Sequence, residues 1–202
     1  MKRIMVLSVI LTIMFSACNN SERGASIMPV GVELHEGDVV FRRGSGLTSR
    51  VVIGVDNQGA YSHVGIVVDS AGTKMIVHAV PDEHDYEGDI DRVKMDKPEV
   101  FFNDVRALRG EVRRHIDAEA GRKAASEAVA LYRRRIPFDH DYDDSDTTRM
   151  YCTELVTYAY RKAGSPLRGI QHHELVFLSL ETNCVLPSDI LGCKDLQKII
   201  KF

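Results

Sequence analysis

One cysteine carries the strongest sign of covalent chemistry in this sequence. Cys152 precedes apolar residues that recur at three- and four-residue spacing, and Gly164 and Pro166 follow as stop signals, which predicts a buried helix with Cys152 in its first turn. At a helix start, unpaired N–H groups and the positive end of the dipole favour an anion, so we expect a lowered thiol pKa and a thiolate near neutral pH. Cys152 is therefore a candidate nucleophile. The alternative is a small hydrophobic residue that packs the helix.

A thiol nucleophile needs a base, and two histidines are placed to assist it. His63 begins an apolar run, His78 lies within the next one, and the glycine-containing loop 69–73 between them predicts an antiparallel hairpin. If the pairing of the two strands is centred on Ala71, His63 lies opposite Ala79. His78 is then within one residue of the position opposite His63. We expect His63 to take the thiol proton and His78 to orient its ring; a core histidine is the alternative for His78.

Further polar groups are needed where the attacked carbonyl oxygen becomes negative. The N–H of Cys152 is expected to meet that oxygen at the helix start. Tyr61 and Tyr151 are candidate second donors or substrate contacts. The remaining histidines lie in loops or polar segments, where surface placement accounts for them.

An acidic segment precedes the cysteine. Residues 139–146 carry five carboxylates in eight positions, but Asp144 stands where an EF-hand needs glycine, and Met150 where it needs a bidentate glutamate. The simpler interpretation is an exposed loop whose end, at 146–148, caps the helix of Cys152. We predict no metal and no soluble cofactor.

The first 17 residues have the pattern of a signal peptide. Lys2 and Arg3 precede a twelve-residue, largely apolar run, which is too short for a comfortable membrane span, and small residues follow before Cys18. Residues 15–18 resemble the lipobox of bacterial lipoproteins. The resemblance implies cleavage before Cys18, a lipid on its sulfur and a protein anchored to a membrane in the cell envelope, facing the periplasm or the exterior.

Length and charge narrow the remaining possibilities. Of the 202 residues, 18–33 are expected to form the lipidated cysteine and a flexible tether, and 34–202 to form one domain with a substantial core. Removing Lys2 and Arg3 takes the formal charge from −3 to −5, so nucleic acid is not an expected partner. In an oxidising compartment, the remaining cysteines at 184 and 193 could close a small loop.

The elements that must position these residues are short strands mixed with helices, which predicts an α+β fold. The expected strands share apolar or alternating patterns and cover 39–41, 64–68, 75–80, 90–95 and, more weakly, 104–108. An amphipathic helix is expected over 117–134. Segment 47–55 is either a short helix or an extended linker, segment 174–180 is either a strand or a helix, and a last short helix begins at Pro187.

Five motifs together resemble the YiiX-like group of circularly permuted, NlpC-type papain-fold hydrolases. They occur in the group's order and span roughly 34–192: Gly37 to Arg42, Tyr61 to Val67, His78-Ala79, Ile136 to Asp139 and Tyr151 to Val156. The resemblance implies a papain-like fold, with an antiparallel sheet or partial barrel packed on helices and a nucleophile at a helix N-terminus. By motif, Cys152 matches the nucleophile and His63 the base. His78 falls on a third position where relatives often have glutamate.

The resemblance and the expected export suggest a cysteine peptidase or amidase. The expected reaction is thiolate attack on an amide, a thioester intermediate and hydrolysis. A cell-wall peptide, such as the stem of peptidoglycan, is the leading substrate. Two alternatives stay open: a lipid-directed thiol acyltransferase or phospholipase, suggested by permuted relatives, and a non-catalytic module that binds peptide or lipid in the same cleft.

Overall fold

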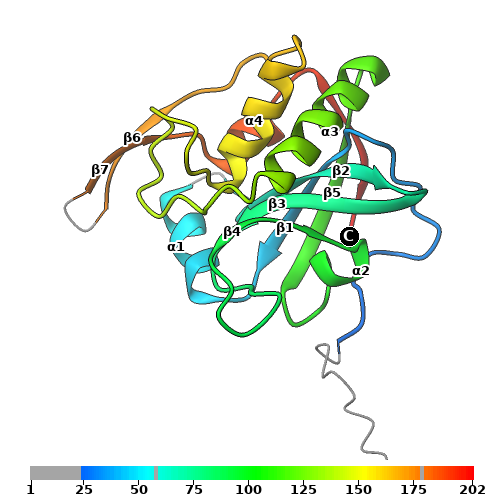
Figure 1. The fold of residues 1–202 in the computed structure, drawn as a ribbon, viewed down its shortest axis with the longest axis horizontal. Helices are drawn as coiled ribbons and strands as arrows, with labels where there is room; N and C mark the ends of the chain where they lie inside the picture. The colour runs from blue at the N-terminus through cyan, green and yellow to red at the C-terminus, as the bar shows by residue number, and fades with distance from the viewer. Residues whose placement is uncertain (1–23, 57–58, 178–179) are drawn as a thin grey trace, which may run out of the picture.

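The computed structural model describes residues 24–56, 59–177 and 180–202 of the chain (Figure 1). The predicted signal segment and Cys18 lie outside these residues. Six antiparallel strands form a sheet in the order β4-β3-β2-β1-β5-β8, with bounds β1 Val39–Gly44, β2 His63–Ser70, β3 Thr73–Val80, β4 Arg92–Asp96, β5 Ala107–His115 and β8 Leu196–Lys201. A separate hairpin pairs β6 (His173–Phe177) with β7 (Leu180–Cys184).

Helices cover both faces of the sheet, so the predicted α+β class is confirmed (Figure 1). The long helices α3 (Ala118–Arg133) and α4 (Cys152–Lys162) pack on one face, over the larger apolar core. The short helix α2 (Pro98–Phe101) lies on the other face with a smaller core. Two further helices, α1 (Leu47–Val55) and α5 (Pro187–Leu191), lie at the end of the sheet near the start of α4.

Local sequence explains where the long helices begin. Asp117 caps α3 through its carboxylate, which accepts hydrogen bonds from the N–H groups of Glu119 and Ala120. Helix α4 has no side-chain cap, and its N-cap residue is Tyr151. The prediction that residues 146–148 cap α4 is therefore wrong: Asp146 instead accepts hydrogen bonds from Thr148 within its own loop.

The hairpin of β2 and β3 is tighter than the sequence suggested. Only Ala71 and Gly72 form its turn, both with positive φ (53° and 83°), as a two-residue hairpin loop requires. The strands therefore extend two residues further toward the turn than expected, and the pairing centre moves by half a residue. The predicted hairpin is confirmed, with a small change of register.

Part of the predicted tether is docked on the domain. The N–H of Ile27 donates to the carbonyl of Phe102 (2.8 Å), the N–H of Asp104 donates to the carbonyl of Ala25 (2.9 Å), and Met28 packs on the smaller core. Residues 25–28 of the predicted flexible tether (residues 18–33) therefore lie against the domain. In the part of the chain that the structure describes, no helix has the length and apolarity to cross a bilayer.

Candidate active site

Cys152 is the first residue of α4, as predicted. The buried face of the helix, made by Leu155, Val156, Ala159 and Tyr160, fixes α4 on the sheet next to β2. The N–H groups of Cys152 and Thr153, together with that of Val64 in β2, face the sulfur. Since Val64 follows His63 directly, the thiol lies near the end of β2 at which the predicted base stands.

Desolvation decides the protonation of this thiol. Burial raises the pKa of Cys152 to about 11, although the three N–H groups and the charge of Arg42 each lower it. The expected thiolate is therefore wrong for the free protein, because the loss of water around the sulfur outweighs the helix N-terminus. The pKa of His63 is held well below 6.5 by burial and then by Arg42 and His78. At rest, Cys152 is therefore a thiol and His63 a neutral imidazole.

His63 and His78 are in contact, as the hairpin predicted. Nε2 of His63 lies 2.8 Å from Nδ1 of His78, and the two rings are inclined at 75°. Ile66 pairs with Val77, so the continuing register sets Gly65 opposite His78 and His63 one diagonal step away. A Cβ at position 65 would lie only 3.2 Å from the Cβ of His78, so glycine leaves the room that this ring uses.

Asp96 extends this contact and was not predicted from the sequence. Its Oδ2 lies 3.1 Å from Nε2 of His78, and both side chains are buried. Burial alone would raise the pKa of Asp96, but His78 and Lys94 lower it well below its usual range. The signal available in the sequence was the expected strand 90–95, which alternates, follows the strand of His78 and leads into Asp96.

Arg42 and Phe101 support the two histidines from the neighbouring elements. Arg42 pairs with His63 across β1 and β2, is 3% exposed, and donates from Nη1 to the carbonyl of Phe101 (2.9 Å). Its guanidinium carbon lies 4.6 Å from the centroid of the Phe101 ring, and that ring lies 5.6 Å and 5.1 Å from the rings of His63 and His78. Glu83 pairs with Arg42.

Of the two tyrosines proposed as oxyanion donors, Tyr61 and Tyr151, only Tyr151 lines the cavity at Cys152. Tyr61 is 1% exposed and donates its hydroxyl to Oε2 of Glu111 (2.8 Å), and it does not line the cavity at Cys152. Tyr61 is therefore not placed to contact a substrate there. Tyr151 does line the cavity, and its hydroxyl accepts a hydrogen bond from the N–H of Val185 (3.1 Å).

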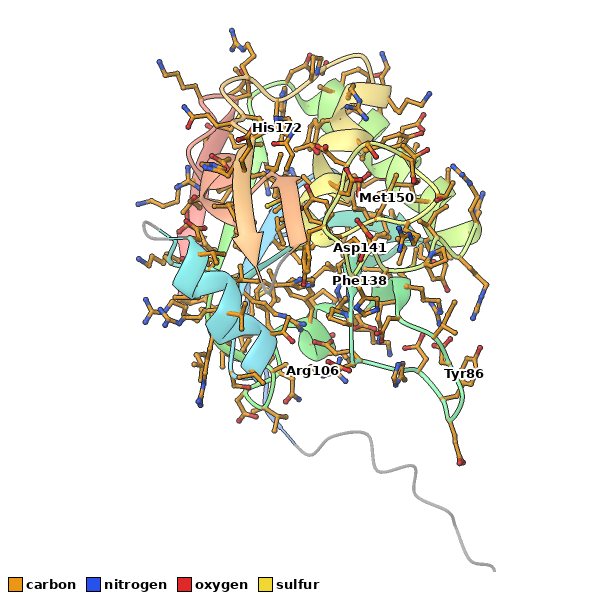
Figure 2. All side chains as sticks on the ribbon, turned by 90° about the vertical axis from the view of Figure 1, so that its left-hand side faces the viewer. Tyr86, Arg106, Phe138, Asp141, Met150 and His172 are labelled. Carbon is orange, nitrogen blue, oxygen red and sulfur yellow. The ribbon has the colours of Figure 1, made fainter. Side chains whose placement is uncertain are left out.

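A cavity of about 380 Å³ opens beside Cys152. Its walls come from α1, the acidic loop, the β6–β7 hairpin and the start of α5, and none of the lining residues found in the described chain is charged. Most are apolar, including Leu47, Val51, Tyr142, Val185 and Leu186. Figure 2 shows α1 and the hairpin side by side, with Asp141 and Phe138 on the adjoining loop.

Among the described residues, Cys184, Cys193 and the acidic loop form neither a disulfide nor a metal site. Cys152, Cys184 and Cys193 are all free, so the possible bridge between 184 and 193 is not formed; Cys184 instead lines the cavity. Within residues 24–56, 59–177 and 180–202, no group of three or more His, Cys, Asp or Glu side chains is arranged to hold a metal ion.

Comparison with known proteins identifies the family. Residues 33–200 match the model of the permuted papain-like amidase enzymes, the YaeF/YiiX or C92 family. The fold is similar to the crystal structure described as metalloprotein yiiX from Escherichia coli O157:H7, with a TM-score of 0.67 and 19% identity over 85% of this chain and 99% of that one. No curated protein matches. His63 precedes Cys152 in the sequence, whereas ordinary papain-like enzymes have the cysteine before the histidine. Because the family model matches nearly the whole described chain, this chain belongs to the family of permuted papain-like amidases.

Proposed function

We propose that the protein is a cysteine hydrolase of NlpC type that cleaves an amide or ester bond next to an apolar chain. Cys152 is the nucleophile, His63 the base and His78 its positioning residue. The cavity beside Cys152 carries this proposal, because its lining in the described chain is largely apolar and without charge. An acyl chain is the group that such a cavity favours.

The reaction follows from the resting protonation states. Because the thiol is neutral, His63 takes its proton as the sulfur attacks the carbonyl carbon. The N–H of Cys152, at the start of α4, stabilises the developing oxyanion. His63 then gives the proton to the leaving amine or alcohol, and a water molecule activated by His63 hydrolyses the thioester.

A peptide of the peptidoglycan stem is the second candidate substrate. It is favoured by the amidase family and by the lipoprotein-like sequence at residues 15–18, which would hold the enzyme at a membrane of the cell envelope through Cys18. Stem peptides carry several charges, and the cavity lining supplies no charged partner for them in the described residues.

Membrane fractionation tests the proposed lipid anchor. We expect Cys18→Ala to release the protein from the membrane fraction.

The test compares substrate classes with one protein. N-acyl amino acids, phospholipid vesicles and soluble peptidoglycan fragments are each incubated with the wild type, and products are identified by mass spectrometry. We expect release of a fatty acid from the acylated substrates, its loss in Cys152→Ala and its retention in Cys193→Ala, which removes a buried thiol outside the cavity. Products from peptidoglycan fragments alone would favour the second candidate. Binding without turnover of any substrate would indicate a non-catalytic module.

A further inference from the structure

We propose that Asp96 is a positioning residue that selects, through His78, which nitrogen of His63 accepts the thiol proton. The inference rests on the proposed function, since it assumes that His63 is the base. Two contacts carry it, Asp96 Oδ2 with His78 Nε2 (3.1 Å) and His78 Nδ1 with His63 Nε2 (2.8 Å), together with the position of the Cys152 sulfur near the N–H of Val64, the residue that follows His63.

Hydrogen-bond chemistry leaves one arrangement of protons for an ionised Asp96. A carboxylate can only accept, so Nε2 of His78 carries a proton and donates it to Asp96. A neutral His78 then has a lone pair on Nδ1, which accepts from Nε2–H of His63. His63 therefore keeps its own lone pair on Nδ1, the nitrogen that can take a proton from the thiol.

The surroundings keep both ends of this chain in the required states. Nζ of Lys94 on β4 lies 3.3 Å from Oδ1 of Asp96, and Nη1 of Arg106 lies 3.6 Å from Oδ2. These two cations keep the carboxylate of Asp96 ionised. Arg42 on β1, itself paired with Glu83, stands beside His63 and disfavours a second proton on either imidazole. Phe101 on α2 covers both rings and carries no charge.

The proton balance of the catalytic step is then simple. The S–H bond of Cys152 breaks, an Nδ1–H bond forms on His63, and the electron pair on sulfur forms the bond to carbon. His63 becomes an imidazolium that still donates from Nε2 to His78, and Asp96 stays ionised. No proton moves between His63, His78 and Asp96, so Asp96 acts only by orientation and charge.

Asp96→Asn reverses this arrangement. Nζ of Lys94 lies closer to Oδ1 (3.3 Å) than Nη1 of Arg106 lies to Oδ2 (3.6 Å), so we expect the asparagine carbonyl at the Oδ1 position and its NH₂ group at the position that faces Nε2 of His78. His78 must then accept at Nε2 and donate from Nδ1, which makes Nε2 of His63 an acceptor and moves its proton to Nδ1. The lone pair of the base is turned away from the thiol. Asp69→Asn is the matched control, because Asp69 pairs with Lys74 on the same sheet and has no hydrogen bond or ion pair with a histidine among the described residues.

The experiment measures tautomers and rates in the same variants. ¹⁵N-histidine NMR of the protein at neutral pH should show His63 and His78 protonated at Nε2 in the wild type and in Asp69→Asn, and at Nδ1 in Asp96→Asn. For the substrate that the wild type turns over, kcat of Asp96→Asn should fall by on the order of 10²-fold or more with KM nearly unchanged.

Two results would overturn the inference. One is a wild-type spectrum with the proton of His63 on Nδ1, which can be recorded even if Asp96→Asn does not fold. The other is a folded Asp96→Asn protein whose tautomers and kcat match those of the wild type. Neither result concerns Cys152, whereas full activity in Cys152→Ala would reject the proposed function and leave the tautomers of His63 and His78 unaffected.

Discussion

At the scale of single residues, the site depends on which groups hold protons before substrate arrives. Cys152 retains its proton because burial outweighs the N–H groups around the sulfur, and His63 stays neutral because it is buried beside Arg42. Cys152 as first residue of a helix and His63 beside His78 were predictable, since both follow from local patterns. The protonation of the thiol was not predictable, because it depends on water excluded by residues distant in sequence.

Gly65 leaves space for the side chain of His78. An added Cβ would meet the Cβ of His78 at 3.2 Å and Cγ2 of Ile76 at 2.7 Å, so Gly65→Ala should displace the imidazole of His78. We expect an activity loss on the order of 10²-fold with a stability loss of about 1–3 kcal/mol, checked by kinetics and urea unfolding. Gly54→Ala on α1, where a Cβ meets nothing within 4 Å, is the control. Equal activities in the two variants would contradict this role.

Glu154 predicts a pH dependence of stability. Glu154 is 3% exposed, and among the described residues neither of its carboxylate oxygens has a hydrogen-bond partner. Burial raises its pKa from 4.5 to about 8, and the charges of Asp139, Asp144 and Asp146 add to the rise. The folded protein therefore binds this proton more tightly than the unfolded chain does. Its contribution to stability is present below pH 4.5 and is lost as pH rises through 8, by up to roughly 1.4 kcal/mol per pH unit.

The variant Glu154→Gln removes that titration. We expect the variant to gain stability relative to the wild type between pH 5 and pH 9, because only the wild type must ionise a buried acid. Chemical unfolding of both proteins at these two pH values measures the difference. Parallel stability curves would show that Glu154 does not titrate in the folded protein as described.

At the scale of elements, β1 and α2 hold the histidine pair from outside β2 and β3. Arg42 of β1 fixes Phe101 of α2 and places a positive charge beside His63. Arg42→Met should therefore raise the pKa of His63 toward 6.5, and the acid limb of kcat/KM should move upward in pH. Glu83 keeps a cationic partner in the variant, since it also pairs with Arg106 (2.8 Å).

The variant Arg42→Lys tests the positive charge of Arg42 separately from the planar shape of its guanidinium group. It keeps the positive charge but cannot reproduce the planar contacts with Phe101 and Glu83. The pH profile should stay near that of the wild type while kcat falls. An acid limb that is the same in Arg42→Met and in the wild type would exclude an electrostatic effect of Arg42 on the base.

Helix α1 forms one wall of the cavity and should set the length of the bound chain. Val51 lines the cavity, so Val51→Trp should exclude several methylene groups, each contributing about 0.8 kcal/mol when buried. We expect KM to rise by about tenfold or more for long-chain substrates and to change little for short ones. Val105→Trp, at a site that is 55% exposed and outside the cavity, should change neither. Equal changes in KM for long-chain and short-chain substrates would show that the apolar chain of the substrate does not bind against Val51.

Elements with a complete local signature were predictable, and those defined by long-range pairing were not. The amphipathic pattern and Asp117 gave the limits of α3 nearly to the residue. Strand β8 was missed because Leu196–Lys201 alternates poorly and exists through its pairing with β5, more than eighty residues earlier. The same limitation hid Asp96, whose contact with His78 requires the register of β3 and β4.

At the scale of the whole molecule, the permuted order joins two segments nearly ninety residues apart. His63 comes from the sheet and Cys152 from the helix packed on it, and Cys152 lines the cavity together with residues of α1 and of the β6–β7 hairpin. The docking of residues 25–28 against Phe102 and Asp104 could not be predicted, because it depends on backbone hydrogen bonds to a segment more than seventy residues away, which the local sequence does not encode.

The formation of an acyl-enzyme tests the central claim, that Cys152 is a nucleophile served by His63. The protein is mixed with the p-nitrophenyl ester of a fatty acid, quenched with acid and analysed by intact and peptide mass spectrometry. We predict the mass of one acyl group on the peptide that contains Cys152, no such adduct in Cys152→Ala, and formation slowed at least about 10²-fold in His63→Ala. Undiminished hydrolysis by Cys152→Ala, or an adduct on another residue, would contradict the account.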